Sequence, residues 1–464
     1  MSKRRVVVTG IGIISPLSIS VEGFWDSLIS GRSGVRPYVS CGRTSLPISV
    51  AAPALFSGDI DEFGISDSGQ RKSVKKGLKM MSREIQMAVA ASSHALSHAE
   101  IFVGQLLPER VGISFGSDYI LTTVEDVIDA VRACSPSSQF DFQRWGKEGL
   151  PKMQPLWQLK YLPNMPASHI AILNNFHGPS NSITLREASV GAVIGESVSI
   201  IASGRTDVML AGTTGGWLHP CKMTSALRNE ELSDSACCPF DLHRNGTVLG
   251  DGAAAIVLEE REHAKKRGVK IWCEIIAGSC KIRRGRKNTD YRREVVRTVI
   301  WDVLRYGALR SDEFADKKII KNNSVKETNS QLDNTSNIIA ATGVIELERI
   351  GHINAHGLGS RDSDKAEAMA INDVFGTRNK PIPVAAAKGF WGNAGAGSGM
   401  FELIASIMSL KMQKFFPTIN HSIPDPECPI LIADPNKHST GDSFIKIAIN
   451  PQGHASALLV KADS

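Results

Sequence analysis

The residues between Ser182 and Gly212 have the layout of a nucleophile elbow. The segment reads SITLREASVGAVIGESVSIIASGRTDVMLAG. An apolar strand runs into a sharp turn, a helix of small residues follows, and a second strand, VMLAG, closes the unit. Such a turn presents one reactive side chain at the N-terminus of the helix. The side chain at the tip is that of Glu187. Because a carboxylate is a weak nucleophile, a glutamate at this position requires an explanation.

The elements that position this turn alternate between strand and helix patterns, which predicts an α/β fold in layers. The opening strand RRVVVTGIGIIS is echoed by VKIWCEIIAGS after residue 268. We therefore expect two similarly built halves, residues 1–260 and 261–464. Within the first half, residues 119–166 lack a regular period and are interpreted as a cap or subunit-contact layer. Within the second half, residues 312–336 are polar and Asn-rich and predict a mobile insertion.

The composition is that of a soluble globular protein. The chain has 464 residues, of which 42% are hydrophobic and 22% charged, and its net charge is +6. The apolar runs are too short to span a bilayer, and the first ten residues lack the core of a signal peptide, so we expect a cytoplasmic protein. The eight cysteines show no paired metal-ligand spacing, which favours reduced thiols and no metal site.

Several motifs resemble the elongating β-ketoacyl-acyl-carrier-protein synthases, the condensing enzymes of the thiolase fold. In chain order they are VVVTGIGIISPL, FWDSLISGRSGV, GRTDVMLAG, CPFDLHRNGTVLGDGAAAIVLEEREHAKKRG, INAHG and AAAKGFWGNAG. The resemblance covers nearly the whole chain. It implies an α-β-α-β-α fold of two similar halves and a dimer. It also implies an acyl substrate carried on the phosphopantetheine arm of an acyl-carrier protein, with no other cofactor.

The resemblance also implies which residues form the site. In the active family an elbow cysteine is acylated, and two histidines and a lysine support decarboxylation of malonyl-carrier protein. The corresponding positions hold Glu187 in place of the cysteine, His356, Lys388, and Asn393 in place of the second histidine. Asp364 and Glu367 match acidic residues that follow the first histidine. The set Cys-His-His thus becomes Glu-His-Asn.

The positions that contact the pantetheine arm and the acyl chain in the family also differ. A threonine pair becomes Leu358 and Ser360 in HGLGS, and Pro451 in NPQG stands where a gate phenylalanine is expected. Two basic runs, residues 71–83 and 281–293, are candidates for docking an acidic carrier protein, although such runs more often belong to a solvated cationic surface.

The charge of Glu187 decides what the elbow can do. Covalent condensation needs a thiolate, whereas a carboxylate would give a mixed anhydride. The helix N-terminus favours the anion by about 0.3–1 kcal/mol, and burial opposes it. An ionised Glu187 would plug the site and repel a malonyl carboxylate. A protonated one would donate a hydrogen bond, like the glutamine of relatives that act as chain-length factors or malonyl decarboxylases. Consecutive strand residues face opposite sides, so we do not expect Arg186 to pair with Glu187.

Three functions remain open from the sequence. The first is a non-condensing subunit of fatty-acid or polyketide assembly, of the chain-length-factor type, in a homodimer or in a heterodimer with a cysteine-bearing ketosynthase. The second is a malonyl-carrier-protein decarboxylase in which His356 and Asn393 form an oxyanion pair, with Lys388 as support. The third is a general acid/base enzyme that uses Glu187 and His356 on another acyl thioester. Lys388 has an alternative structural interpretation, an ion pair with Glu367.

Overall fold

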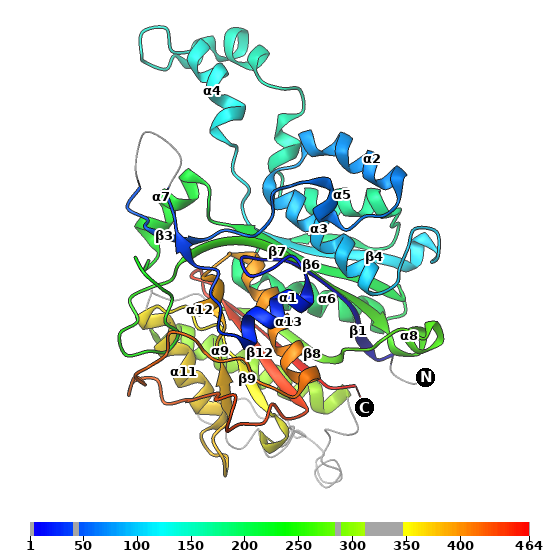
Figure 1. Ribbon diagram of the computed structural model, residues 1–464, viewed down its shortest axis with the longest axis vertical. Coiled ribbons are helices and arrows are strands. Elements are labelled where there is room, and N and C mark those ends of the chain that lie inside the picture. Colours follow the sequence, from blue (N-terminus) through cyan, green and yellow to red (C-terminus); the bar gives the residue numbers. More distant parts are fainter. Residues whose placement is uncertain (1–3, 40–45, 284–288, 311–346, 464) are drawn as a thin grey trace, which may run out of the picture.

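The computed structural model describes residues 4–39, 46–283, 289–310 and 347–463 (Figure 1). The predicted insertion at 312–336 lies outside these ranges. The strands are β1 Val6–Ile14, β2 Arg36–Pro37, β3 Val50–Ala52, β4 Val111–Ser117, β5 Ser180–Ile183, β6 Val208–Gly216, β7 Leu249–Glu260, β8 Cys273–Ile282, β9 His352–Asn354, β10 Pro383–Ala385, β11 Leu431–Ile432, β12 Ser443–Ile449 and β13 His454–Lys461.

The helices connect these strands. They are α1 Val21–Ile29, α2 Ser68–Gly77, α3 Arg83–His98, α4 Val124–Ala133, α5 Met165–Asn174, α6 Ser189–Ala202, α7 Pro220–Asn229, α8 Arg261–Arg267, α9 Thr289–Arg310, α11 Arg361–Phe375, α12 Lys388–Trp391 and α13 Ala396–Met412.

The two halves of the sheet repeat one pairing scheme. In the first half the strand order is β1-β7-β6-β4-β5, and in the second it is β8-β13-β12-β9-β10. In each half the first two pairings are antiparallel and the next two are parallel. The halves join where Val7 and Val8 of β1 pair with β8. The α/β fold of two similar halves is therefore confirmed.

Helices separate and cover the two halves of the sheet (Figure 1). Helices α3 and α5 cover the outer face of the first half, and α9 and α11 cover that of the second. Between them lie α6 and α13, which contact strands on either side. Residues 396–410 of α13 are all buried, as expected for a central helix whose residues, apart from Glu402, are apolar or small. The order of layers is helix, sheet, helix, sheet, helix.

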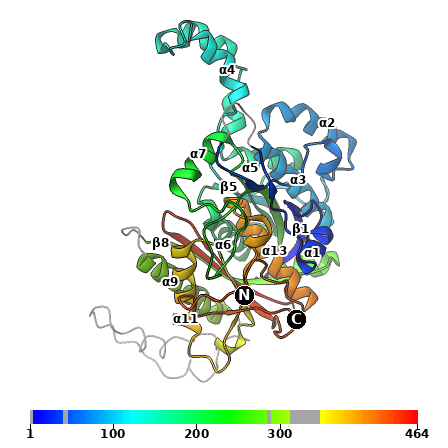
Figure 2. The ribbon, with the colours of Figure 1, turned by 60° about the vertical axis from the view of Figure 1, so that its left-hand side comes forward.

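Residues 119–164 form an arm, which contains α4 and several short turns. The α4 end of this arm stands away from the layered body in both ribbon views (Figures 1 and 2). Of the nineteen large hydrophobic side chains that are exposed among the described residues, eight lie on the arm. These eight are Tyr119, Val124, Val131, Phe140, Phe142, Leu150, Leu156 and Leu162. An apolar surface of this kind is typical of a protein contact.

In the described ranges, the helices are all too short or too polar to cross a membrane.

Candidate functional site

The elbow forms where β5 ends and α6 begins. A single 3₁₀ turn, Arg186–Ala188, connects them, and Arg186 adopts a left-handed backbone with φ of 50°. A non-glycine residue in this region costs about 1–2 kcal/mol, which the surrounding packing must offset. Helix α13 packs closely at this point, since a Cβ added to Gly399 would lie 3.0 Å from the carbonyl oxygen of Glu187. The turn places Glu187 at the start of α6 with only 1% of its surface exposed.

Arg186 and Glu187 form an ion pair, contrary to the prediction from strand geometry. Arg186 Nη2 lies 3.1 Å from Glu187 Oε1 and 3.0 Å from Glu230 Oε1. The prediction was wrong because β5 already ends at Ile183, and the left-handed conformation of Arg186 turns its side chain toward its neighbour. The guanidinium also stacks over the ring of Trp217, 4.7 Å from the centroid. Arg186 thus links two carboxylates and an aromatic ring beside the elbow.

Asn393 directs its amide at the elbow carboxylate. Its Nδ2 donates to Glu187 Oε1 over 2.9 Å, while its Oδ1 accepts from the backbone N–H of Gly395 at 3.0 Å. Oε1 of Glu187 therefore accepts from both a guanidinium and an amide, which are the contacts of a carboxylate. The other oxygen, Oε2, has no hydrogen-bond partner among the described residues.

His356 is oriented by Lys388. The ammonium Nζ lies 3.0 Å from His356 Nδ1 and 2.7 Å from the carbonyl oxygen of His356. Because an ammonium only donates, Nδ1 must accept, and the imidazole carries its proton on Nε2. Burial, followed by the positive charge of Lys388, lowers the pKa of His356 well below its usual value. The histidine is thus a neutral Nε2–H donor.

The predicted pairing of Lys388 with Glu367 is wrong. The carboxylate beside Lys388 is that of Glu402 on α13. Glu367 instead accepts the backbone N–H groups of His356 at 2.6 Å and Gly357 at 2.9 Å. Asp364 accepts the N–H of Gly359 at 3.1 Å. Both acids on α11 therefore hold the loop that carries the histidine.

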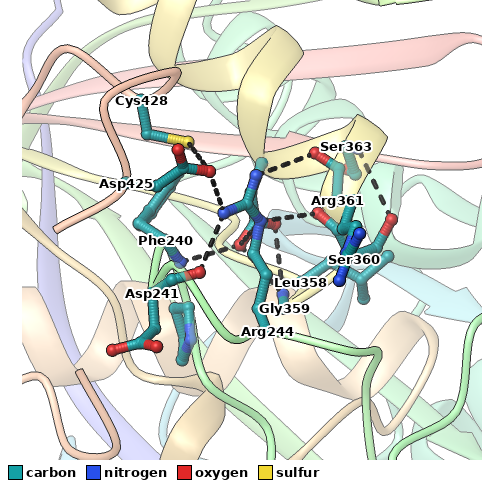
Figure 3. A network of polar contacts seen from close by, with 12 residues as sticks. Phe240, Asp241, Arg244, Leu358, Gly359, Ser360, Arg361, Ser363, Asp425 and Cys428 are labelled. Carbon is teal, nitrogen blue, oxygen red and sulfur yellow. Dashed lines mark hydrogen bonds and ion pairs between the residues drawn. The ribbon is translucent and has the colours of Figure 1, made fainter. Parts of the chain in front are cut away.

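A buried arginine holds the next part of that loop (Figure 3). Arg244 is 2% exposed and its Nη1 lies 2.5 Å from Asp425 Oδ2. The same guanidinium donates to the carbonyl oxygens of Ser360 at 3.3 Å and Arg361 at 3.1 Å (Figure 3). Ser360 also caps α11, because its side chain accepts from the N–H of Ser363. The loop between His356 and α11 is therefore fixed at both ends.

One pocket of about 580 Å³ brings the elbow and the histidine together. It is lined by Arg186, Glu187, Trp217, Ser225, Asn229, Glu230, Glu231, Arg283, Tyr291, Arg292, His356, Leu358, Ser360, Asp362, Ser363, Ile449, Asn450, Pro451 and Gln452. The lining includes all three residues expected to contact the phosphopantetheine arm or the acyl chain, which are Leu358, Ser360 and Pro451. Lys388 and Asn393 are not part of this lining, but they contact two residues that are, His356 and Glu187.

The structure offers no replacement nucleophile from Cys237. This thiol is buried and donates to the carbonyl oxygen of Leu358 at 3.3 Å. Burial, reinforced by the carboxylate of Asp364, raises the pKa of Cys237 far above its usual value. The side chain therefore remains a thiol, which is inert as a nucleophile.

Sequence reasoning missed three charged residues of this site, Arg186, Glu402 and Lys446. The sequence pattern predicts Arg186 as part of a strand. Glu402 and Lys446 lie in apolar segments far along the chain, and a charged residue inside such a segment is the one signal that could have drawn attention to them. Both are buried, with 0% and 1% exposure.

Asp118 adds a pH dependence to the region. Burial raises its pKa from 3.8 to about 6, Lys222 opposes this shift, and Glu187 reinforces it. As the pH rises, the Asp118 carboxyl group loses its proton at a lower pH in the unfolded state than in the folded state. Its contribution to folding stability is therefore present below pH 4 and is lost as the pH rises through 6. We expect Asp118→Asn to reduce the fall in unfolding free energy between pH 4 and pH 7 by up to about 3 kcal/mol. Urea unfolding at a series of pH values measures this.

The matched control is Asp129→Asn, since that side chain is 74% exposed. It should leave the pH dependence unchanged. If the unfolding free energy changed equally with pH in the wild type and in Asp118→Asn, the raised pKa of Asp118 would be contradicted.

Two family models together match most of the chain. The family model of the β-ketoacyl synthase N-terminal domain matches residues 3–264, and that of the C-terminal domain matches residues 311–422. The 3-oxoacyl-[acyl-carrier-protein] synthase 2 of Coxiella burnetii is 28% identical over 439 residues, which cover 92% of this chain and 91% of that protein. The protein of the same name from Vibrio cholerae is 28% identical over 433 residues, which cover 92% of this chain and 90% of that protein.

Two solved structures share the fold over their full lengths. One is a type II polyketide synthase ketosynthase in complex with its acyl-carrier protein, with a TM-score of 0.77, 21% identity and 100% coverage of both chains. The other is the ishigamide ketosynthase/chain length factor, with a TM-score of 0.76, 22% identity and 100% coverage of both chains.

Proposed function

Because the chain belongs to the β-ketoacyl synthase family, we propose that it acts in fatty-acid or polyketide assembly as a non-condensing subunit of the chain-length-factor type. One observation carries this proposal: the elbow holds a carboxylate that is already engaged by Arg186 and Asn393. A condensing site instead requires a free thiolate at this point. Glu187 also lines the pocket, so its carboxylate would repel an incoming malonyl carboxylate.

The pocket supports binding of an acyl group carried by an acyl-carrier protein. Leu358, Ser360 and Pro451 line it and would contact the phosphopantetheine arm. Arg283 and Arg292 belong to the second basic run of the sequence and line the same pocket. They are therefore better placed than the first basic run to meet an acidic carrier protein beside its arm.

The arm at residues 119–164 supports the subunit role. Its exposed apolar side chains would be covered by a second chain, either another copy or a cysteine-bearing ketosynthase. Dimerisation through the arm is part of the proposal.

We expect the wild-type chain to gain no mass when it is incubated with octanoyl- or malonyl-acyl-carrier protein and examined by intact-protein mass spectrometry. The double variant Arg186→Ala/Glu187→Cys is the matched comparison, because it removes the guanidinium and supplies the thiol together. It is expected to gain one octanoyl group, whereas Glu187→Cys alone retains Arg186 in front of the thiol and should gain far less. A stable acyl adduct on the wild-type chain would overturn the proposal.

A second function is favoured by the intact pair of His356 and Lys388. A neutral Nε2–H donor in the pocket could stabilise the enolate that forms when malonyl-carrier protein loses carbon dioxide. Asn393 would contribute less to stabilising the enolate than the sequence predicts, since its amide already donates to Glu187. Release of carbon dioxide by the wild-type chain, lost in His356→Gln, would replace the subunit proposal with decarboxylation.

A further inference from the structure

Lys446 is a buried lysine that the proposed function does not use. It lies on β12, an otherwise apolar strand, with 1% of its surface exposed. An ammonium group that is removed from water needs a charged partner and further hydrogen bonds to remain ionised. Lys446 has both, because its Nζ lies 2.5 Å from Glu402 Oε2 and donates to the carbonyl oxygen of Ile447.

The contacts of Lys446 continue to the histidine. Glu402 binds Lys446 through Oε2 and Lys388 through Oε1, so one carboxylate is shared by two lysines. Lys388 in turn donates to His356 Nδ1. A continuous series of charged groups therefore runs from β12 through α13 and α12 to the pocket.

In this series each oxygen of the one carboxylate engages its own lysine, Oε1 with Lys388 and Oε2 with Lys446. Without Lys446, both oxygens of Glu402 would compete for Lys388 and draw it from Nδ1. The charged groups that act on His356 from the surrounding elements are Lys388, Lys446, Glu402, Glu367, Arg186, Glu187 and Arg292.

We propose that Lys446 is a positioning residue for His356. By engaging the far oxygen of Glu402, it keeps Lys388 directed at Nδ1 and thereby places the single imidazole proton on Nε2, toward the pocket. Burial and the positive charges of Lys388 and Lys446 lower the pKa of His356, which agrees with this arrangement. The inference is independent of whether the pocket condenses, decarboxylates or only binds.

The test is ¹⁵N NMR of the full-length chain labelled at histidine, with His356 assigned by the signals that disappear in His356→Gln. In the wild type we expect an unprotonated Nδ1 and a protonated Nε2 between pH 6 and pH 8. In Lys446→Met we expect the unprotonated Nδ1 signal to be lost from at least half of the molecules at pH 6. The double variant Lys446→Met/Glu402→Gln also removes the carboxylate that would draw Lys388 away from Nδ1, so it should recover the wild-type signals.

Lys414→Met is the control, because this lysine is exposed just beyond α13 and should leave the His356 signals unchanged. Lys446→Gln keeps a donor and similar volume without the charge, so it provides the same test if Lys446→Met does not fold. Wild-type signals in either Lys446 variant would overturn the proposal. A wild-type His356 that is protonated on Nδ1 at pH 7 would overturn it as well.

Discussion

Replacement of Arg244 by methionine is expected to lower the free energy of unfolding by about 3–5 kcal/mol. The guanidinium is 2% exposed, and it lies 2.5 Å from Asp425 and donates to three backbone carbonyl groups (Figure 3). Methionine fills similar volume but leaves the Asp425 carboxylate without its cation and the carbonyl groups without donors. Removing one partner of a buried ion pair is more destabilising than replacing both partners by apolar residues, because the charge that remains is buried without a partner.

The measurement is chemical denaturation of wild type and variant under identical conditions. Arg132→Met is the control, since Arg132 is 72% exposed and lies 3.6 Å from Asp129. An exposed pair of this kind contributes at most about 1 kcal/mol. If Arg244→Met were no more destabilising than this control, the network would not be what holds the loop after His356.

The second large effect is expected on the arm. Phe142→Asp should raise the dissociation constant of the dimer by about 30-fold or more, which corresponds to about 2 kcal/mol for the loss of an aromatic anchor. Phe142 is 73% exposed and lies on the arm that carries the exposed apolar side chains. Sedimentation velocity of the chain alone, and of its mixture with a cysteine-bearing ketosynthase, measures both possible pairings.

Leu107→Asp is the matched control, because Leu107 is 70% exposed but lies outside the arm. It should leave assembly unchanged. An equal effect of both variants, or unchanged assembly in Phe142→Asp, would remove the arm from the proposed interface. A chain that is monomeric alone and in the mixture would contradict the subunit proposal itself.

The layered fold could be predicted because it depends on patterns that are local in the sequence. Alternation of strand and helix periods indicated the layers, and the echo of the first strand indicated two halves. The arm was harder to predict. Its lack of period indicated a segment outside the core, but α4 and the projection from the body depend on contacts that no short window contains.

The candidate site was predictable to a similar extent. One pocket brings together Glu187, His356 and the three residues expected to contact the phosphopantetheine arm or the acyl chain. What the sequence did not show is which charges pair. Lys388 has Glu402 as its partner instead of Glu367, because α13 passes directly behind the histidine loop while Glu367 is occupied by backbone N–H groups.

From the sequence alone one can determine the family resemblance, the layered fold and the absence of a thiol at the elbow, since each follows from residue types in a local order. The tertiary structure alone decides how the glutamate that stands there is held. The left-handed backbone of Arg186 turns its guanidinium onto Glu187, and Asn393 reaches the same oxygen from the other half of the fold. Electrostatic interactions depend on separation in space and on burial, and neither quantity is encoded in the spacing of residues along the chain.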